Sequence, residues 1–251
     1  MKTIGILGAM AQEIDEVKKL MTDVKTQEIG GRTFFEGYLQ GKHCVVAFSK
    51  WGKVAATMTS VILITVFKVD EIVFIGTAGG IAPGIKVGDV VVANRLVQHD
   101  LDSRPMQKQF EIPLLNRIYV ETDERLRQIV VQTVNKLIER GNGVIINKDK
   151  AAEFNITNTT LHIGDVASGD KFVNSDEQRD TLLSLLPDVL CVEMEGAALA
   201  QVCCEFGTPF VVIRIISDSA DNNAHFDFGN FIKEVANAYS TEIIGEMMKE
   251  V

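Results

Sequence analysis

Near the end of the chain stands the run Phe210-Val211-Val212-Ile213-Arg214-Ile215-Ile216, which is apolar at every position but one. A strand with one face in water alternates apolar and polar residues, whereas a strand in a sheet that is covered on both faces is apolar almost throughout. Ile4–Leu7 and Val189–Val192 have the same continuous apolar character. These runs therefore predict a sheet that lies between two layers of helices.

Segments with the apolar spacing of helices alternate with these strands. Three boundaries are marked by capping residues: Thr122 as an N-cap, Ser175 with Gln178 as a capping box, and Gly207 as a stop signal. The predicted strands are 4–7, 32–38, 43–48, 71–75, 89–96, 161–167, 189–192 and 210–216, and the predicted helices are 13–21, 54–67, 122–141, 175–185, 196–206 and 228–248.

This alternation predicts the α/β class and one domain over residues 1–251. No linker, repeat or low-complexity segment divides the chain. Residues 100–116 and 147–160 have neither a strand nor a helix pattern, so we expect two long loops, which are often functional or mobile.

Composition excludes several classes of function. The 251 residues carry 25 Lys and Arg against 34 Asp and Glu, which gives a formal net charge of −9. Because neutralising phosphates requires clustered cations, we expect no nucleic-acid partner. No apolar run approaches the ~18 residues of a membrane span, so we expect no membrane partner. The first residues also lack a signal-peptide pattern.

Four cysteines, Cys44, Cys191, Cys203 and Cys204, all lie in apolar stretches. They form neither a CxxC pair nor a Cys/His set with zinc spacing, and the four histidines show no mutual metal spacing either. We therefore expect no metal. Buried, reduced thiols are typical of a reducing compartment, so the sequence predicts a cytoplasmic protein.

Two glycine-rich segments follow predicted strands. The first, Gly5-Ile6-Leu7-Gly8-Ala9-Met10-Ala11-Gln12-Glu13, has the spacing of neither a dinucleotide fingerprint nor a P-loop. Its Glu13 lies in the first helical turn, where it either acts in catalysis or complements the helix dipole. The second, Gly76-Thr77-Ala78-Gly79-Gly80, either brings backbone N–H groups close to a ligand or forms a tight irregular turn.

Two carboxylates interrupt the apolar run Cys191-Val192-Glu193-Met194-Glu195-Gly196-Ala197. An unpaired buried carboxylate is costly, so each requires a partner or a ligand. In an extended segment Glu193 and Glu195 point to the same face, and ionised carboxylates there suit the vicinal hydroxyls of a sugar. The alternative is a strand end with solvated acids.

Charged residues also mark the predicted strand 210–216. Arg214 lies inside it and must pair with an acid or bind a ligand. Asp218 follows its carboxyl end, where open α/β sheets bind ligands. The alternative for Ser217 and Asp218 is that they cap a turn.

Taken together, these segments resemble the methylthioadenosine/S-adenosylhomocysteine nucleosidases, within the purine nucleoside phosphorylase superfamily. The resemblance implies one α/β domain with a twisted mixed β-sheet flanked by helices, usually a homodimer. It also implies hydrolysis of the N-glycosidic bond of adenine nucleosides without metal or cofactor. The substrates it implies are 5′-methylthioadenosine and S-adenosylhomocysteine, with 5′-deoxyadenosine as a further candidate, in methionine salvage. The matching pieces, in order, are Gly5-to-Glu13, Gly76-to-Gly80, Val166-Ala167-Ser168-Gly169-Asp170-Lys171-Phe172, Val192-Glu193-Met194-Glu195-Gly196-Ala197 and Ile216-Ser217-Asp218.

The resemblance implies three catalytic residues. Asp218 would protonate the adenine at N7, which requires a pKa raised by burial or by hydrogen bonding. Glu195 would bind the ribose hydroxyls. Glu13 would hold and activate the attacking water, with help from Arg214 and Thr77.

It also implies a set of substrate-binding residues. Phe172 would stack on the adenine, and the backbone of Val173 would read its edge. Met194 would lie against the sugar, and Ser217 would orient Asp218. The others in this set are Met10, Trp51, Thr77, Ala78, Gly79, Glu193, Arg214 and Phe228.

The chain departs from the family pattern at several places. Thr77 stands where the family commonly has Ser, and Trp51 stands where a smaller aliphatic residue is usual beside the ribose or its 5′ group. Phe228 aligns with the pocket for that group. The 100–116 loop does not match the family, and the 147–160 stretch is longer than expected. The 5′ substituent is therefore the part of the substrate that the resemblance defines least.

Three rival functions are weighed against hydrolysis of these substrates. A nucleoside phosphorylase needs cations for phosphate, but this chain has Phe74 and Glu13 where related phosphorylases carry arginines. Hydrolysis with another 5′ group, such as that of aminodeoxyfutalosine, keeps the same chemistry. A nucleoside-binding protein without catalysis would not need the set of Glu13, Glu195 and Asp218.

Overall fold

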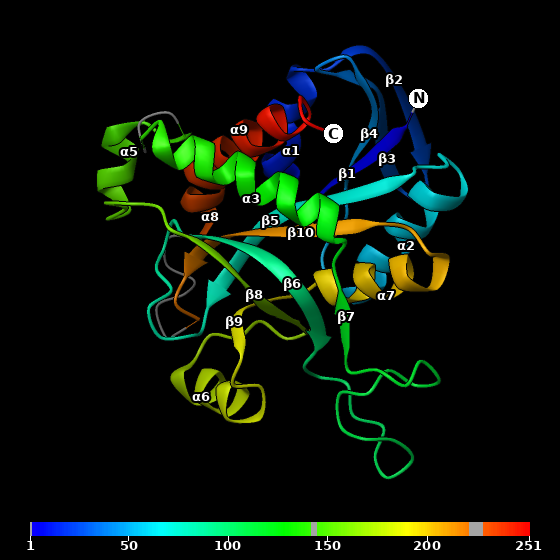
Figure 1. The fold of residues 1–251 in the computed structure, drawn as a ribbon, viewed down its shortest axis with the longest axis vertical. Coiled ribbons are helices and arrows are strands. Elements are labelled where there is room, and N and C mark those ends of the chain that lie inside the picture. The colour runs from blue at the N-terminus through cyan, green and yellow to red at the C-terminus, as the bar shows by residue number, and fades with distance from the viewer. Residues whose placement is uncertain (1, 142–144, 221–227) are drawn as a thin grey trace.

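Strands and helices alternate along the chain in the computed structural model, which describes residues 2–141, 145–220 and 228–251 (Figure 1). The α/β class is therefore confirmed. The strands are β1 Thr3–Gly8, β2 Thr22–Ile29, β3 Arg32–Leu39, β4 Lys42–Phe48, β5 Glu71–Gly80, β6 Val90–Gln98, β7 Tyr119–Glu121, β8 Leu161–Ser168, β9 Val189–Glu193 and β10 Phe210–Asp218. The helices are α1 Ala11–Lys19, α2 Lys53–Thr65, α3 Glu124–Glu139, α5 Lys148–Glu153, α6 Asp176–Leu185, α7 Gly196–Phe206, α8 Phe228–Phe231 and α9 Asn237–Met247, with a π-helical turn Ile232–Ala236 between the last two.

One ten-stranded mixed sheet organises the fold, as the resemblance implies. Its strands follow the order β10-β6-β8-β9-β5-β1-β4-β3-β2, with β7 beside β6. Strand β10 pairs with β5 in parallel and with β6 in antiparallel orientation. Because β5 also pairs with β9, the strands β5, β9, β8, β6 and β10 form a closed circuit of pairings. This closure brings the ends of β5, β9 and β10 together.

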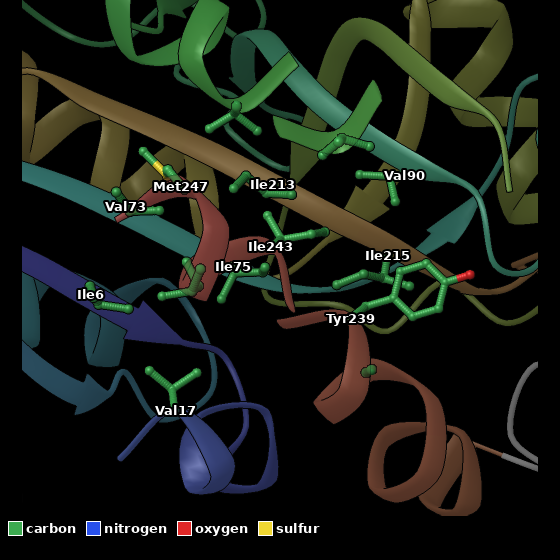
Figure 2. Close-up of a cluster of buried hydrophobic side chains, with 14 of the residues drawn as sticks. Ile6, Val17, Val73, Ile75, Val90, Ile213, Ile215, Tyr239, Ile243 and Met247 are labelled. Carbon is green, nitrogen blue, oxygen red and sulfur yellow. The ribbon is translucent and has the colours of Figure 1, made fainter. Parts of the chain in front are cut away.

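Helices cover both faces of the sheet. Helices α1, α3 and α9 gather on one side, and α2 and α7 pack together on another (Figure 1). Figure 2 shows Ile213 and Ile215 of β10 among side chains of α9, including Tyr239 and Ile243, all of them fully or almost fully buried. Burying an aliphatic side chain of this size contributes roughly 1.5–3 kcal/mol, so each of these strand side chains adds to the stability of the fold.

Several elements differ from the sequence prediction. Strand β2 is exposed at every residue except Ile29 and has no apolar alternation, so its sequence carried no strand signal. The short β7 and α5 lie in or beside the stretches predicted as loops. The N-cap of α3 is Asp123 rather than Thr122, because the Asp123 carboxylate accepts the Leu126 N–H at 2.9 Å. The Thr122 hydroxyl instead donates to the Ala93 carbonyl at 2.7 Å.

The second glycine segment is part of a strand. Residues 76–80 continue β5, so the tight-turn alternative is wrong. Glycine is needed there because other chain segments approach closely: a Cβ on Gly79 would lie 2.9 Å from Asp218 Oδ1. The other boundaries are closer to prediction, since α7 ends at Gly207 with a φ of 67° and Ser175 caps α6.

Candidate active site

A cavity of about 310 Å³ opens at the carboxyl ends of β1, β5, β9 and β10. Three carboxylates face it, those of Glu193, Glu195 and Asp218, and the rest of its wall is mainly apolar or small. The other described residues that line it are Ala9, Met10, Trp51, Thr77, Ala78, Gly79, Lys171, Phe172, Val173, Val192, Met194 and Ser217.

Most of the residues singled out from the sequence meet in this cavity. The side chains of Glu13 and Phe228 lie outside the described residues. Arg214 is not among the described lining residues, and its guanidinium is fully buried behind Glu193. The predicted residues that line the cavity are Met10, Trp51, Thr77, Ala78, Gly79, Phe172, Val173, Glu193, Met194, Glu195, Ser217 and Asp218.

Asp218 is held by short local hydrogen bonds. The Ser217 hydroxyl donates to Asp218 Oδ2 at 2.7 Å, and the Ala220 N–H donates to Oδ1 at 2.8 Å. An irregularity in the register of β10 between Ile216 and Asp218 sets Asp218 opposite Gly79 of β5. The carboxyl group is thus fixed at the wall of the cavity, at the end of a rigid strand.

Glu193 and Arg214 pair with each other. Arg214 Nη2 donates to Glu193 Oε2 at 2.8 Å, and the two side chains are 0% and 3% exposed. The Arg214 guanidinium also stacks over the Phe74 ring at 4.2 Å. The expectation that Arg214 must pair with an acid is therefore confirmed, and the two charges neutralise each other.

The Glu193 carboxylate also caps the N-terminus of α7. It accepts the backbone N–H of Glu195 at 3.0 Å and that of Gly196 at 2.8 Å, and the Ser168 hydroxyl donates to it. Ser168 accepts the Ala197 N–H in turn, at 2.7 Å. These groups are the otherwise unsatisfied donors of a helix N-terminus, so Glu193 has a structural function as well as a place in the cavity wall.

Glu195 differs from the extended geometry that the sequence suggested. Strand β9 ends at Glu193, and Glu195 occupies the N-cap position of α7 with φ −134° and ψ −40°. The two carboxylates reach the same cavity through a strand end and a helix start rather than from one strand face. Glu195 Oε1 accepts the Gly52 N–H at 2.7 Å, which links it to the turn before α2.

Two hydrophobic walls complete the cavity. Trp51 donates its indole N–H to Met10 Sδ at 2.8 Å, although its side chain remains 65% exposed. Phe172, which is 42% exposed, and the buried Val173 form another wall. An aromatic and apolar wall with a few aligned polar groups is typical of small-molecule sites.

Sequence reasoning did not single out three of the lining residues, Ala9, Lys171 and Val192. Each is the immediate neighbour of a residue that was singled out, inside the same motif. Ala9 and Val192 contribute no polar side chain, so no chemical signal marked them. Lys171 is exposed, and because lysines are mostly exposed in proteins, its sequence position did not mark it as a site residue.

The comparisons with known proteins agree with this geometry. Residues 3–244 match the family model described as Phosphorylase superfamily. A 5′-methylthioadenosine/S-adenosylhomocysteine nucleosidase of Marinomonas sp. (strain MWYL1) is 35% identical over 250 residues, which cover 99% of both chains. An aminodeoxyfutalosine nucleosidase of Helicobacter pylori (strain ATCC 700392 / 26695) is 34% identical and covers 99% of this chain and 98% of its own.

The fold also matches a solved enzyme along its entire length. The 5′-methylthioadenosine/S-adenosylhomocysteine nucleosidase of Neisseria meningitidis, in complex with methylthio-immucillin-A, superimposes with a TM-score of 0.88 at 33% identity, covering 100% of each chain. The chain therefore belongs to the phosphorylase superfamily and, within it, to the family of the 5′-methylthioadenosine/S-adenosylhomocysteine nucleosidases.

Proposed function

We propose that this protein hydrolyses the N-glycosidic bond of 5′-methylthioadenosine and S-adenosylhomocysteine, releasing adenine. Hydrolysis of an adenine nucleoside is the reaction that the family names have in common. The finer choice of the 5′ group rests on the 35% identity with the Marinomonas nucleosidase and on an apolar pocket wall that suits a thioether.

The proposed mechanism uses the three carboxylates of the cavity and the water nucleophile. Asp218 protonates the leaving adenine at N7, with Ser217 fixing the orientation of its carboxyl group. Cleavage builds positive charge on the ribosyl group, which the Glu195 carboxylate stabilises electrostatically, while Glu193, already paired with Arg214, holds the start of α7 in place. Glu195 also accepts hydrogen bonds from the ribose hydroxyls. Glu13, whose side chain lies outside the described residues, would activate the water.

The observation that carries this proposal is the charge of the cavity. Among the described residues that line it, none is an arginine, and the single cation is the exposed Lys171. Phosphate recognition uses arginines and lysines, and an ionised carboxylate such as that of Glu195 repels a phosphate dianion. Arg214 offers no alternative phosphate site, because its charge is already paired with Glu193. Water is therefore the nucleophile that this site favours.

A second candidate substrate is aminodeoxyfutalosine, which shares the adenine and ribose. It is favoured by the 34% identity with the Helicobacter pylori nucleosidase over almost the whole chain. Parallel assays of adenine release from methylthioadenosine, S-adenosylhomocysteine and aminodeoxyfutalosine test this choice. We expect the two sulfur nucleosides to have the higher kcat/KM. A higher kcat/KM for aminodeoxyfutalosine would overturn the proposed 5′ group but would leave the proposed hydrolysis unchanged.

We further propose a homodimer that covers the exposed apolar side chains around α2 and α7. Val54 and Phe206, which are 81% and 50% exposed, line a hollow between α2 and α7 together with Val61 and Val202. Exposed apolar side chains beside a hollow are typical of a subunit interface. Sedimentation of the wild type and of Val54→Lys tests this: a dimer that the variant weakens is expected, and a wild-type monomer would contradict the proposal.

The proposed setting is the cytoplasm, in methionine salvage. Cys44, Cys191 and Cys203 are buried as free thiols, and burial raises the pKa of Cys44 to about 12. Such thiols are inert and suit a reducing compartment. Among the described residues, no helix has the length and apolar character needed to cross a membrane.

A further inference from the structure

Three charged residues outside the cavity connect the segments that form its walls. Lys53, the first residue of α2, donates its backbone N–H to Asp170 Oδ1 at 2.8 Å and its ammonium group to Asp100 Oδ1 at 2.6 Å. Asp100 Oδ2 accepts the Asp170 N–H at 2.8 Å, which closes a ring of contacts. We call Lys53, Asp100 and Asp170 the wall network.

The wall network is partly shielded from water. The side chains of Lys53 and Asp100 are 18% and 29% exposed, and Gln98 Oε1 accepts a further bond from the Lys53 ammonium at 3.2 Å. Burial disfavours the charge on Asp100, but the hydrogen bonds from Lys53 and from the Asp170 N–H outweigh it and lower its pKa. Charge-assisted bonds of this kind are stronger than exposed ion pairs, so they can fix the position of a segment.

One side of the wall network leads to Glu195. Gly52, which donates to Glu195 Oε1, directly precedes Lys53 and adopts a φ of +87° that favours glycine. A Cβ on Gly52 would lie 2.8 Å from Asp170 Oδ1, so the two segments are in direct contact. Helix α2 has no capping side chain on its own N-cap residue, and Asp170 accepts the N–H of its first residue instead.

The other side leads to the aromatic wall. Asp170 is two residues before Phe172, and its backbone is held by Asp100. None of the three wall-network residues is among the described residues that line the cavity. Any effect they have on a bound nucleoside is therefore indirect, through lining residues such as Glu195 and Phe172.

We propose that the wall network is a positioning unit. It holds the Glu195 carboxylate within hydrogen-bond distance of the ribose hydroxyls and holds the Phe172 ring against the base. This inference rests on the proposed function. Because the Gly52 N–H helps to orient the Glu195 carboxylate, loss of the Lys53 ammonium should weaken recognition of the ribose hydroxyls more than it destabilises the fold.

The test compares Lys53→Met and Asp100→Asn with the wild type on methylthioadenosine and on its 2′-deoxy and 3′-deoxy analogues. We expect both variants to fold, to raise KM, and to lower the preference for the hydroxyl-bearing substrate by about tenfold or more, because small displacements of positioned groups cost rate. Lys53→Arg, which keeps the charge, should recover most of the preference. Lys136→Met, which breaks the exposed pair with Glu250, is the matched control.

The outcomes separate this proposal from the proposed function. A wild type that releases no adenine would overturn the proposed function. A wild type that releases adenine but accepts the deoxy analogues equally well would overturn the role of Glu195 in ribose recognition, and the wall network with it. A wild type with strong preference for the hydroxyls, together with an unchanged preference in Lys53→Met and Asp100→Asn, would overturn the wall network alone. A uniform loss of activity toward all three substrates, with a lowered melting temperature, would show that the wall network only stabilises the fold. That result would also overturn the proposal.

Discussion

At the scale of single residues, the site depends on how each carboxylate is held. Asp218 accepts hydrogen bonds from Ser217 and from Ala220, and Glu195 accepts the Gly52 N–H. The sequence indicated these acids because they stand at strand ends inside apolar runs, where a buried carboxylate is costly unless it has a partner or a ligand. It contained no sign of Gly52 as a partner, since the two residues lie 143 positions apart.

Replacing Asp218 by Asn tests the proposed acid. An amide oxygen still accepts a hydrogen bond from the Ala220 N–H, so we expect a normal fold and nucleoside binding within a few fold of the wild type. An amide cannot protonate the base, so kcat should fall by about 10²–10⁴. Steady-state kinetics and a melting curve measure both, with Asp180→Asn on the exposed face of α6 as the control. A kcat close to that of the wild type would remove Asp218 from the mechanism.

At the scale of elements, some strands form only because a distant segment pairs with them, and local sequence patterns do not predict these strands. The apolar runs and caps predicted α7 and β10 well, because their signals are local. They missed β2, whose residues are exposed and whose strand conformation depends on pairing with β3. They also treated residues 76–80 as separate from β5, because glycine is a poor strand former unless a neighbour approaches closely.

The pair of Glu193 and Arg214 links β9 to β10 beneath the cavity, and its removal tests the structure of the site. Arg214→Met leaves a buried carboxylate without its cation, so we expect a loss of about 3–5 kcal/mol in the free energy of unfolding. The double variant Glu193→Gln with Arg214→Met should recover part of this loss. Denaturant titration measures both. A single variant as stable as the wild type would show that the pair does not stabilise the fold.

At the scale of the whole molecule, closure of the sheet explains why one cavity collects residues from the entire chain. Residues from positions 9 to 218 meet because β1, β5, β9 and β10 end at one place. The sequence predicted the layered α/β class from local pattern and, through the resemblance, the mixed sheet. The closed circuit was not predicted, because the pairing of β10 with both β5 and β6 leaves no local pattern.

Stability of the whole fold should depend on pH through His99. Burial outweighs its acidic neighbours and lowers the pKa of His99, and the ring lies against Gly169, where a Cβ would sit 2.4 Å from Nε2. The unfolded chain therefore binds a proton that the folded chain rejects, so the stabilisation is present above the ordinary histidine pKa of about 6.5 and is lost as pH falls through the lowered value.

Free energies of unfolding, measured between about pH 5 and pH 8, check this dependence, because that range includes the ordinary histidine pKa of about 6.5. We expect stability to decrease toward acid in the wild type and to decrease less steeply in His99→Gln. Lys136→Met, which removes only an exposed ion pair with Glu250, should keep the wild-type slope. Equal slopes in His99→Gln and the wild type would assign the acid sensitivity to other groups.

The central claim is that water, and not phosphate, attacks the ribosyl group in this cavity. The most direct measurement incubates the protein with methylthioadenosine in ¹⁸O-labelled water that contains phosphate, and analyses the sugar product by mass spectrometry. The account predicts free methylthioribose that carries one ¹⁸O atom from the solvent, formed at the same rate without phosphate. A sugar phosphate, formed only when phosphate is present, would contradict it.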